Sequence, residues 1–252
     1  MSAITYHQMG TGAHKVLCLN GWLGHAKDWG GLTQYLDLDN FTYVFMDYRG
    51  YGMRHKLKGN YDMAEISADA LALVDQLGWG QFSLLGHSMG GMAIQKILAQ
   101  APDRVKKLVA LCPVPASGVP FDDEQWALFS SAVNTPEARG LIIDFTTGNR
   151  LPKQWIEAMV QSSVRHATKE AFAGYLQAWV STDFAAQIRG LELPVLVLVG
   201  ENDPGLSAEF CEQTWLQFYP QASLSVISNA GHYPMFETPL ILATEIEKFL
   251  AA

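Results

Sequence analysis

The 252-residue chain is acidic: 17 basic and 25 acidic side chains give a formal net charge of −8. Hydrophobic residues make up 49% of it, which excludes an intrinsically disordered chain and suffices for one sizeable buried core. The acidic balance argues against nucleic-acid binding, because neutralisation of phosphates by Lys and Arg supplies most of that affinity. The densest basic patch, formed by Arg54, Lys56 and Lys58, is interpreted as a solvated loop.

Three widely spaced cysteines, Cys18, Cys112 and Cys211, do not form the pattern of a disulfide framework. Each lies in or beside an apolar run, so we expect small buried thiols and a cytoplasmic protein. Residues 1–7 lack the basic and apolar regions of a signal peptide, and no apolar stretch is long enough to span a membrane. No cluster has metal-ligand spacing, so neither a metal nor another cofactor is predicted.

Short apolar runs alternate with segments of helical periodicity. We predict an antiparallel edge strand at 4–8 and buried strands at 16–20, 42–46, 81–85, 105–111, 195–199 and 222–227. Helices are predicted at 63–77, 89–100, 206–218 and 240–250. This alternation predicts an α/β fold with a doubly wound, mostly parallel sheet and helices on both faces.

Residues 113–190 interrupt the alternation with helical patterns and no convincing strand. We predict that they form a helical cap inserted into a single domain, whose α/β core comprises 1–112 and 191–252. The segment is rich in large apolar side chains, among them Trp126, Phe129, Trp155, Phe172 and Trp179. These side chains are expected to line an apolar pocket, to attach the cap to the core, or both.

The strongest motif is Gly86-His87-Ser88-Met89-Gly90, which matches the G-x-S-x-G pattern around a nucleophilic serine. It lies between the predicted strand 81–85 and the predicted helix 89–100, the setting that the motif requires. The turn exposes the Ser88 hydroxyl at the edge of the sheet, beside a helix N-terminus that favours negative charge. We predict that Ser88 is a nucleophile; the alternative is an ordinary turn in which Ser88 caps the helix.

A serine nucleophile needs a base and an acid that orients the base, in the chain order Ser, acid, His. Asp203 follows the predicted strand 195–199, and His232 follows the predicted strand 222–227. Both therefore lie at the carboxyl edge of the sheet, as Ser88 does. We predict that His232 is the base and Asp203 the acid, preferring Asp203 to Glu201 of the same loop because it precedes Pro204.

Other polar residues of these loops are interpreted as structural. His25 is the competing base, because its loop also reaches the carboxyl edge, and we interpret it as packing near the pocket mouth. The side chain of His87 is expected to point away from that of Ser88 and into the turn. Glu201 is expected to be a surface residue. Asp47 and Arg49 are expected to fix the turn 47–52 by local hydrogen bonds.

An acyl-transfer site also needs hydrogen-bond donors for an oxyanion. The backbone N–H of Met89, directly after the nucleophile, is one candidate. The other is the N–H of Trp22 in the loop 20–24, where Gly21 lets the backbone approach a substrate carbonyl. The alternative is a glycine-rich turn in which Trp22 belongs to the core.

Together the motifs at 20–24, 47–52, 86–91, 200–203 and 231–232 resemble those of the α/β-hydrolase superfamily. The resemblance implies an eight-stranded-type sheet, a Ser88–His232–Asp203 triad and an oxyanion hole at Trp22 and Met89. It is strongest to small capped enzymes such as carboxylesterases, enol-lactonases, carbon–carbon bond hydrolases and pimeloyl-ester esterases. Relatives with an aspartate nucleophile, the haloalkane dehalogenases and epoxide hydrolases, are disfavoured by the serine.

The sequence departs from the family pattern at two loops. Family members often carry His-Gly where this chain has Asn20-Gly21, and the side chain at that place orients the oxyanion loop. The turn 47–52 often ends in Gly-x-Ser, whereas here Gly52 is followed by Met53 and Arg54.

These features predict a serine hydrolase that cleaves a small or medium, largely apolar carboxylic ester through an acyl-enzyme. One alternative uses the same triad to open a lactone or cleave a carbon–carbon bond. Another is a receptor for a small ligand with slow or no turnover. Neither a nucleic-acid nor a membrane partner is predicted, and the sequence does not indicate an oligomeric state.

Overall fold

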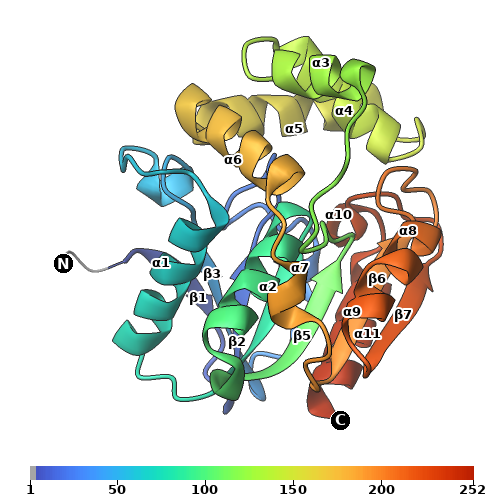
Figure 1. The fold of residues 1–252 in the computed structure, drawn as a ribbon. Helices are drawn as coiled ribbons and strands as arrows, with labels where there is room; N and C mark the ends of the chain where they lie inside the picture. The colour runs from blue at the N-terminus through green and yellow to red at the C-terminus, as the bar shows by residue number, and fades with distance from the viewer. Residues whose placement is uncertain (1–3) are drawn as a thin grey trace.

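A computed structural model describes residues 4–252 and contains one seven-stranded sheet with the order β1-β3-β2-β4-β5-β6-β7 (Figure 1). Strand β1 pairs with β3 antiparallel, and all other neighbours are parallel. The strands are β1 (Tyr6–Met9), β2 (His14–Leu19), β3 (Phe41–Met46), β4 (Phe82–His87), β5 (Val105–Leu111), β6 (Val195–Gly200) and β7 (Ala222–Ile227).

Every predicted strand is confirmed to within two residues at each end. The resemblance implied an eight-stranded-type sheet, and here the expectation is wrong by one strand among residues 4–252. The chain before β2 supplies only β1, which pairs directly with β3 and forms the edge of the sheet.

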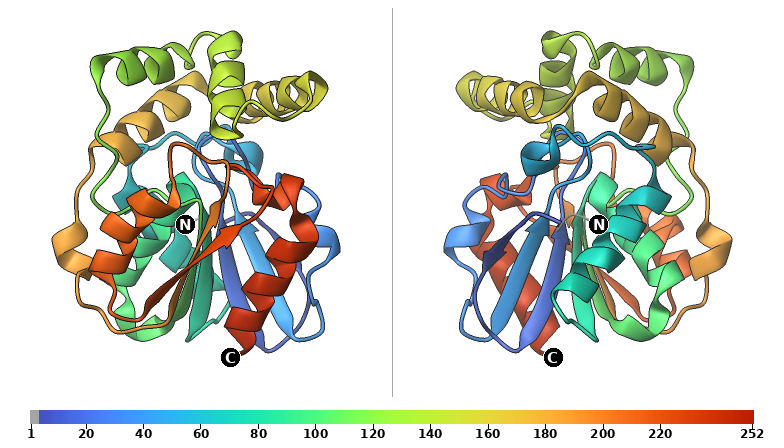
Figure 2. Two further views of the ribbon diagram at one scale, coloured as in Figure 1. Left: turned by 90° about the vertical axis from the view of Figure 1, so that its right-hand side faces the viewer. Right: turned by 90° about the vertical axis from the view of Figure 1, so that its left-hand side faces the viewer.

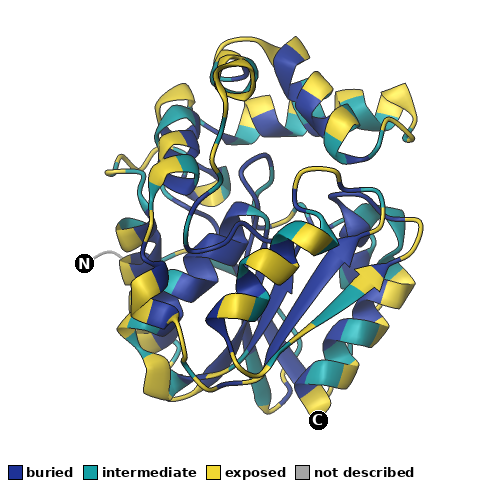
Figure 3. Ribbon diagram, turned by 45° about the vertical axis from the view of Figure 1, so that its right-hand side comes forward, coloured by how far each residue is buried: buried dark blue, intermediate teal, exposed yellow. Residues whose placement is uncertain are grey.

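Helices cover both faces of the sheet, as predicted (Figure 2). One face carries α1 (Met63–Gln76), α2 (Met89–Gln100), α8 (Ala208–Gln213) and α9 (Trp215–Phe218), and the other carries α11 (Pro239–Ala251). Short 3-10 turns occupy Leu32–Gln34, Gly52–Arg54 and Pro102–Arg104. The central strands β2 to β6 are largely buried, as are the inner faces of the helices, whereas the outer faces of the helices are exposed (Figure 3). The edge strands β1 and β7 are mostly half-buried or exposed, so the expectation that residues 222–227 form a buried strand is wrong in its burial, because β7 has a neighbouring strand on one side only.

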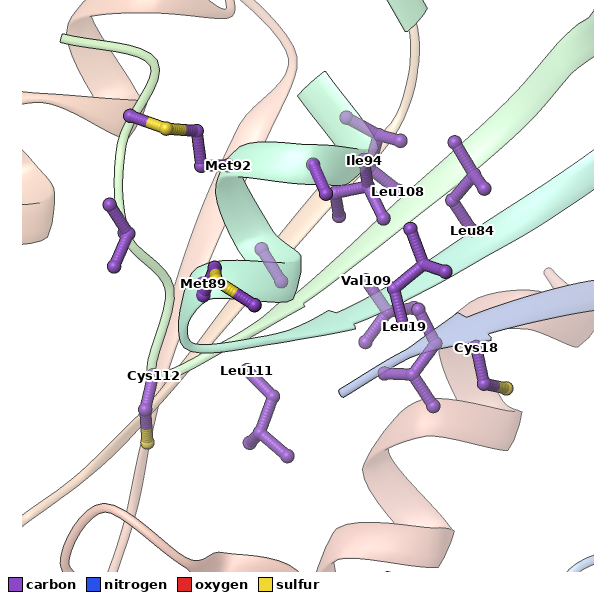
Figure 4. Close-up of a cluster of buried hydrophobic side chains, with 14 of the residues drawn as sticks. Cys18, Leu19, Leu84, Met89, Met92, Ile94, Leu108, Val109, Leu111 and Cys112 are labelled. Carbon is purple, nitrogen blue, oxygen red and sulfur yellow. The ribbon is translucent and has the colours of Figure 1, made fainter. Parts of the chain in front are cut away.

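Helix α2 packs against the central strands through apolar side chains. Met89 and Ile94 of this helix belong to a cluster of buried hydrophobic side chains that also includes Leu84 of β4 and Leu108 and Val109 of β5 (Figure 4). This packing fixes the N-terminus of α2, and therefore the turn before it, relative to the sheet.

Two expectations for the core are wrong in detail. The predicted helix 206–218 is interrupted at Thr214, because the backbone there leaves the helical region and the Thr214 hydroxyl donates to the Phe210 carbonyl (2.7 Å). Arg54 is only 4% exposed and pairs with Asp69 at 2.8 Å, so it does not belong to a solvated patch. The three cysteines are buried and unpaired, as expected.

The segment 113–190 contains no β-strand; an isolated bridge joins Ala167 to Tyr51. Its helices are α3 (Asp123–Ser131), α4 (Pro136–Thr146), α5 (Lys153–His166), α6 (Lys169–Ser181) and α7 (Ala185–Ile188). Helices α3 to α6 lie above the carboxyl ends of the parallel strands, whereas α7 lies beside α2 (Figure 1). The division into a core and a cap with a boundary at 190 stays a prediction.

The described part of the chain, residues 4–252, has no helix with both the length and the apolar character needed to cross a bilayer.

Gly90 tests how closely the N-terminus of α2 approaches the sheet. A Cβ at this position would lie 2.2 Å from the carbonyl oxygen of Leu19 in β2. Glycine to alanine inside a helix ordinarily stabilises by about 1 kcal/mol. We predict the opposite sign for Gly90→Ala, a loss of about 2 kcal/mol or more in the free energy of unfolding measured in urea. Gly80→Ala is the control, because no atom lies within 4 Å of its Cβ position; equal stability of the two variants would contradict the predicted contact.

Candidate active site

Ser88 has a strained backbone at the turn between β4 and α2, with φ 54° and ψ −118°. Such a conformation costs of order 1–3 kcal/mol in a non-glycine residue and persists only where the surroundings impose it. Here the Ser88 N–H donates to Leu111 O (2.9 Å), and its carbonyl accepts from the N–H groups of Gly91 (2.8 Å) and Val114 (3.0 Å). The strained turn is therefore fixed by hydrogen bonds to β5, to α2 and to the chain that follows β5.

The Ser88 side chain does not cap α2, which removes support from the alternative interpretation of the motif. Among residues 4–252 its hydroxyl makes no protein hydrogen bond, and Ser88 lines a cavity above the sheet. Bonds between a nucleophile and its base are often long or poorly aligned before substrate binds, so the free hydroxyl is compatible with a nucleophilic role.

Asp203 and His232 form a direct hydrogen bond. The Nδ1–H of His232 donates to Oδ2 of Asp203 at 2.6 Å, and both side chains are buried. The other carboxylate oxygen of Asp203 accepts from the N–H groups of Gly205 (3.0 Å) and Leu206 (3.2 Å). With Nδ1 carrying the proton, a neutral His232 presents an unprotonated Nε2, the form that a general base requires.

One cavity of about 120 Å³ is lined by Ser88, Asp203 and His232 together. The three predicted residues, far apart in sequence, thus reach one space at the carboxyl edge of the sheet. No Lys or Arg of the described residues lines it. The remaining wall is mainly apolar, and its larger apolar or aromatic side chains are those of Trp22, Leu23, Val114, Val119, Phe121, Phe129, Ile142, Phe145, Trp179, Leu206 and Tyr233.

Two buried backbone N–H groups lie close to Ser88. Trp22 and Met89 are both buried, and among residues 4–252 neither N–H donates a hydrogen bond within the protein. A Cβ on Gly21 would lie 3.0 Å from Cβ of Ser88, so only glycine lets this backbone pass so near the serine. Because buried N–H groups are nearly always paired, these two are suited to a ligand oxygen.

A family model described as alpha/beta hydrolase fold matches residues 15–239. The chain belongs to this family. A non-heme haloperoxidase from Rhodococcus erythropolis is 26% identical over 245 residues, covering 91% of this chain and 89% of that protein. A pimeloyl-[acyl-carrier protein] methyl ester esterase from Nitrosomonas europaea is 27% identical over 255 residues, covering 95% and 96%. The solved structure of an esterase from Exiguobacterium antarcticum aligns with a TM-score of 0.87 at 21% identity, covering 99% and 96% of the two chains.

In this α/β-hydrolase, the loop 20–24, which carries the candidate donor Trp22, is held by the side chain of Asn20 and by two tyrosines that the sequence did not single out. Asn20, where many members have histidine, donates from Nδ2 to the carbonyls of Gly21 (3.0 Å) and Gly24 (2.9 Å). The hydroxyl of Tyr48 donates to Asn20 O (2.6 Å), and that of Tyr51 to Trp22 O (2.9 Å). The turn 47–52 therefore supports the loop that carries Trp22, which its sequence pattern alone did not indicate.

Asp47 and Arg49 fix that turn partly through distant partners. Asp47 accepts from the N–H of Met53 (2.8 Å), the residue directly after the turn, and from the N–H of Ala26 (2.7 Å), which follows the loop 20–24. Arg49 pairs with Asp69 of α1 at 2.8 Å. The expectation of a structural turn is correct, but its bonds are not only local.

The indole of Trp22 contacts helices of the segment 113–190. Its ring stacks on that of Phe172 in α6 with centroids 3.9 Å apart, and its Nε1–H donates to Phe172 O at 2.8 Å. Phe129 of α3 stacks on the same indole at 5.9 Å. One candidate oxyanion donor is thus positioned from both sides, by the core and by the helices above it.

His87 and His25 do not act as competing bases in this geometry. The Nε2–H of His87 donates to His232 O (2.8 Å). The His87 side chain therefore lies against the loop after β7, and the expectation that it points into its own turn is wrong. Burial, together with the nearby His232, lowers the pKa of His87 to about 3, which keeps it neutral. His25 packs on His166 of α5, with ring centroids 4.0 Å apart, and does not line the cavity. Glu201 is exposed and accepts from Asn229 N, as expected of a surface turn.

One group of potential metal ligands is found among residues 4–252: Cys112, Asp203 and His232, whose ligand atoms lie within 4.8 Å of one another. Asp203 and His232 already bond each other. Burial, with a further contribution from Asp203, raises the pKa of the Cys112 thiol, whereas metals bind the thiolate. The chemistry of the group favours a hydrogen-bonded pair over a metal centre.

Proposed function

We propose that the chain is a serine hydrolase that cleaves small or medium, uncharged carboxylic esters with an apolar acyl group. The observation that carries the proposal is the shared cavity, in which a strained serine meets a histidine bonded to a buried aspartate. Relatives along most of the chain include methyl ester esterases, which supports an ester as the substrate.

The reaction begins with attack of the Ser88 hydroxyl on the ester carbonyl, while Nε2 of His232 accepts the hydroxyl proton. Asp203 stabilises the resulting imidazolium through its bond to Nδ1. The N–H groups of Trp22 and Met89 donate to the oxyanion of the tetrahedral intermediate. The imidazolium then returns its proton to the leaving alcohol, which leaves an acyl group on Ser88.

Water completes the cycle. His232 removes a proton from a water molecule as it attacks the acyl-enzyme, and Ser88 recovers its proton as the acid leaves. No metal, redox step or organic cofactor is needed, because the serine, the imidazole and the backbone donors supply every bond change.

The helices of 113–190 act as a cap in this proposal. Phe129, Ile142, Phe145 and Trp179 of this segment all line the cavity. An apolar wall of this kind gains affinity from buried acyl carbons, at about 25 cal/mol per Å² removed from water. Because Phe172 also holds Trp22, the cap contributes to the oxyanion site as well as to the acyl pocket.

Replacement of the nucleophile tests the reaction. We predict that Ser88→Ala lowers kcat for p-nitrophenyl butyrate by at least about 10⁴-fold, because the covalent step is lost while the donors remain. Ser83→Ala is a matched control, since Ser83 lies on the same strand and bonds His14 away from the cavity; it should retain wild-type turnover. Near-wild-type hydrolysis by Ser88→Ala would show that Ser88 is not the nucleophile.

A panel of substrates identifies the type of bond that the enzyme cleaves. The same triad serves lactone opening and hydrolytic carbon–carbon cleavage, so simple esters, lactones and diketones are to be compared side by side. Multiple turnover of any of them separates an enzyme from a ligand receptor, which would bind and stall.

The charge of the substrate is a separate prediction. No Lys or Arg of the described residues lines the cavity, so a carboxylate on the acyl chain would be buried without a cationic partner. We predict that kcat/KM for mono-p-nitrophenyl succinate is at least about 100-fold below that for p-nitrophenyl pentanoate, an acyl chain of similar size. Comparable values for the two esters would contradict an apolar acyl pocket.

A further inference from the structure

Glu237, at the end of the short helix α10 (Pro234–Glu237), brackets the loop that carries His232. Its Oε2 accepts from the N–H of Gly231 at 2.8 Å, and its Oε1 accepts from the N–H of Tyr233 at 3.1 Å. These are the two residues on either side of His232. One carboxylate therefore fixes the backbone before and after the imidazole.

The Glu237 carboxylate is itself held by a residue of the segment 113–190. Arg150, between α4 and α5, donates from Nη2 to Oε2 of Glu237 at 2.7 Å. The Glu237 side chain is 2% exposed and that of Arg150 33%, so the pair joins a buried anion to a partly exposed cation. A buried carboxylate is tolerated when it is paired and hydrogen-bonded, and here two N–H groups and a guanidinium supply that compensation.

The backbone N–H and carbonyl of His232 itself also have hydrogen-bond partners. Its N–H donates to Thr146 O of α4 at 3.0 Å, and its carbonyl accepts from Nε2 of His87 at 2.8 Å. Glycine has the widest conformational freedom of all residue types, and Gly231 directly precedes His232. The loop therefore needs hydrogen bonds to other segments to keep the imidazole in one place. The N–H groups of three successive residues, 231 to 233, are thus all fixed from outside the loop.

We propose that Glu237 is a positioning residue for the base His232, and that Arg150 couples this positioning to the segment 113–190. The inference rests on the proposed function, because it concerns the same imidazole. Glu237 does not line the cavity and does not reach the reacting atoms. It acts by keeping Nε2 where it meets the Ser88 hydroxyl; a shift of the order of 1 Å in such a group costs about 10²-fold in rate.

The test compares Glu237→Gln with Glu201→Gln. Glutamine at 237 removes the charge and replaces one acceptor oxygen by an NH₂ group, so at most one of the two backbone bonds survives. Glu201 is a matched control, because its carboxylate accepts from the N–H of Asn229 in the same loop after β7 but does not bond the residues on either side of His232. We predict a fall in kcat of about 10- to 100-fold for Glu237→Gln with KM within about threefold, and turnover within twofold for Glu201→Gln.

A spectroscopic readout separates positioning from general destabilisation. In the wild type, the Nδ1–H of His232 donated to Asp203 should give a downfield proton resonance in NMR spectra. Glu237→Gln should broaden or lose that signal while circular dichroism shows a folded protein, and Glu237→Asp should restore part of both signal and turnover. If Glu237→Gln does not fold, Arg150→Gln, which leaves both backbone bonds in place, should lower kcat severalfold in a folded protein.

The outcomes distinguish this inference from the proposed function. Labelling of the wild type by a fluorophosphonate at Ser88, lost in Ser88→Ala, establishes the nucleophile independently. If the wild type is not labelled, the proposed function fails, and the inference with it. If it is labelled but a folded Glu237→Gln is labelled at the same rate, with unchanged kcat and NMR signal, the positioning role is overturned. With Arg150→Gln as the folded substitute, unchanged kcat overturns it equally.

Discussion

The backbone conformation of Ser88 is the constraint on which the site depends. Its φ of 54° and ψ of −118° are unfavourable for a residue with a side chain and are stable only because neighbours impose them. The hydrogen bond that Ser88 donates to Leu111, those that it accepts from Gly91 and Val114, and the close approach of Gly90 to β2 supply that stability. The strain places a hydroxyl that has no hydrogen-bond partner among residues 4–252 at the carboxyl edge of the sheet, above a fully buried β4.

The other parts of the site are arranged around that hydroxyl by bonds between distant segments. Trp22 is positioned by Tyr51 from the core and by Phe172 from α6. His232 is positioned by Asp203 through its ring and by Thr146 and His87 through its backbone. Helices above the sheet thus bond both to the loop 20–24 that carries Trp22 and to the loop that carries His232. A displacement of these helices would disturb both halves of the proposed machinery, so the segment does more than cover the pocket.

The sequence was sufficient to predict the order of strands and helices along the chain, the turn at Ser88, and the position of Ser88, Asp203 and His232 at one edge of the sheet. These features follow from local signals: apolar runs ended by glycine, and polar residues directly after strands. The supporting contacts were not predictable in this way. Tyr48 and Tyr51 lie in a turn without a distinctive spacing, and their roles depend on where β2 and β3 lie in the sheet.

Other differences arise from tertiary contacts, or from a side-chain hydrogen bond to the backbone, that override the apolar or charge pattern. Arg54 looked like one cation of a solvated patch, but Asp69 of α1 draws it into the interior. His87 was expected to stay within its own turn, but a carbonyl of the loop after β7 accepts its N–H. Thr214 interrupts a helix whose apolar periodicity is continuous, because its side chain competes for a backbone carbonyl. For Arg54 and His87 the partner is remote in sequence, whereas for Thr214 it is the carbonyl of Phe210, four residues earlier in the chain.

The most direct test of the account is a crystal structure of the protein after reaction with an alkyl fluorophosphonate, which mimics the tetrahedral intermediate. We predict phosphorus bonded to Oγ of Ser88, a phosphonyl oxygen within hydrogen-bond distance of the N–H groups of both Trp22 and Met89, and the alkyl chain in the apolar cavity. An adduct on another residue, or a phosphonyl oxygen directed away from both N–H groups, would contradict the account.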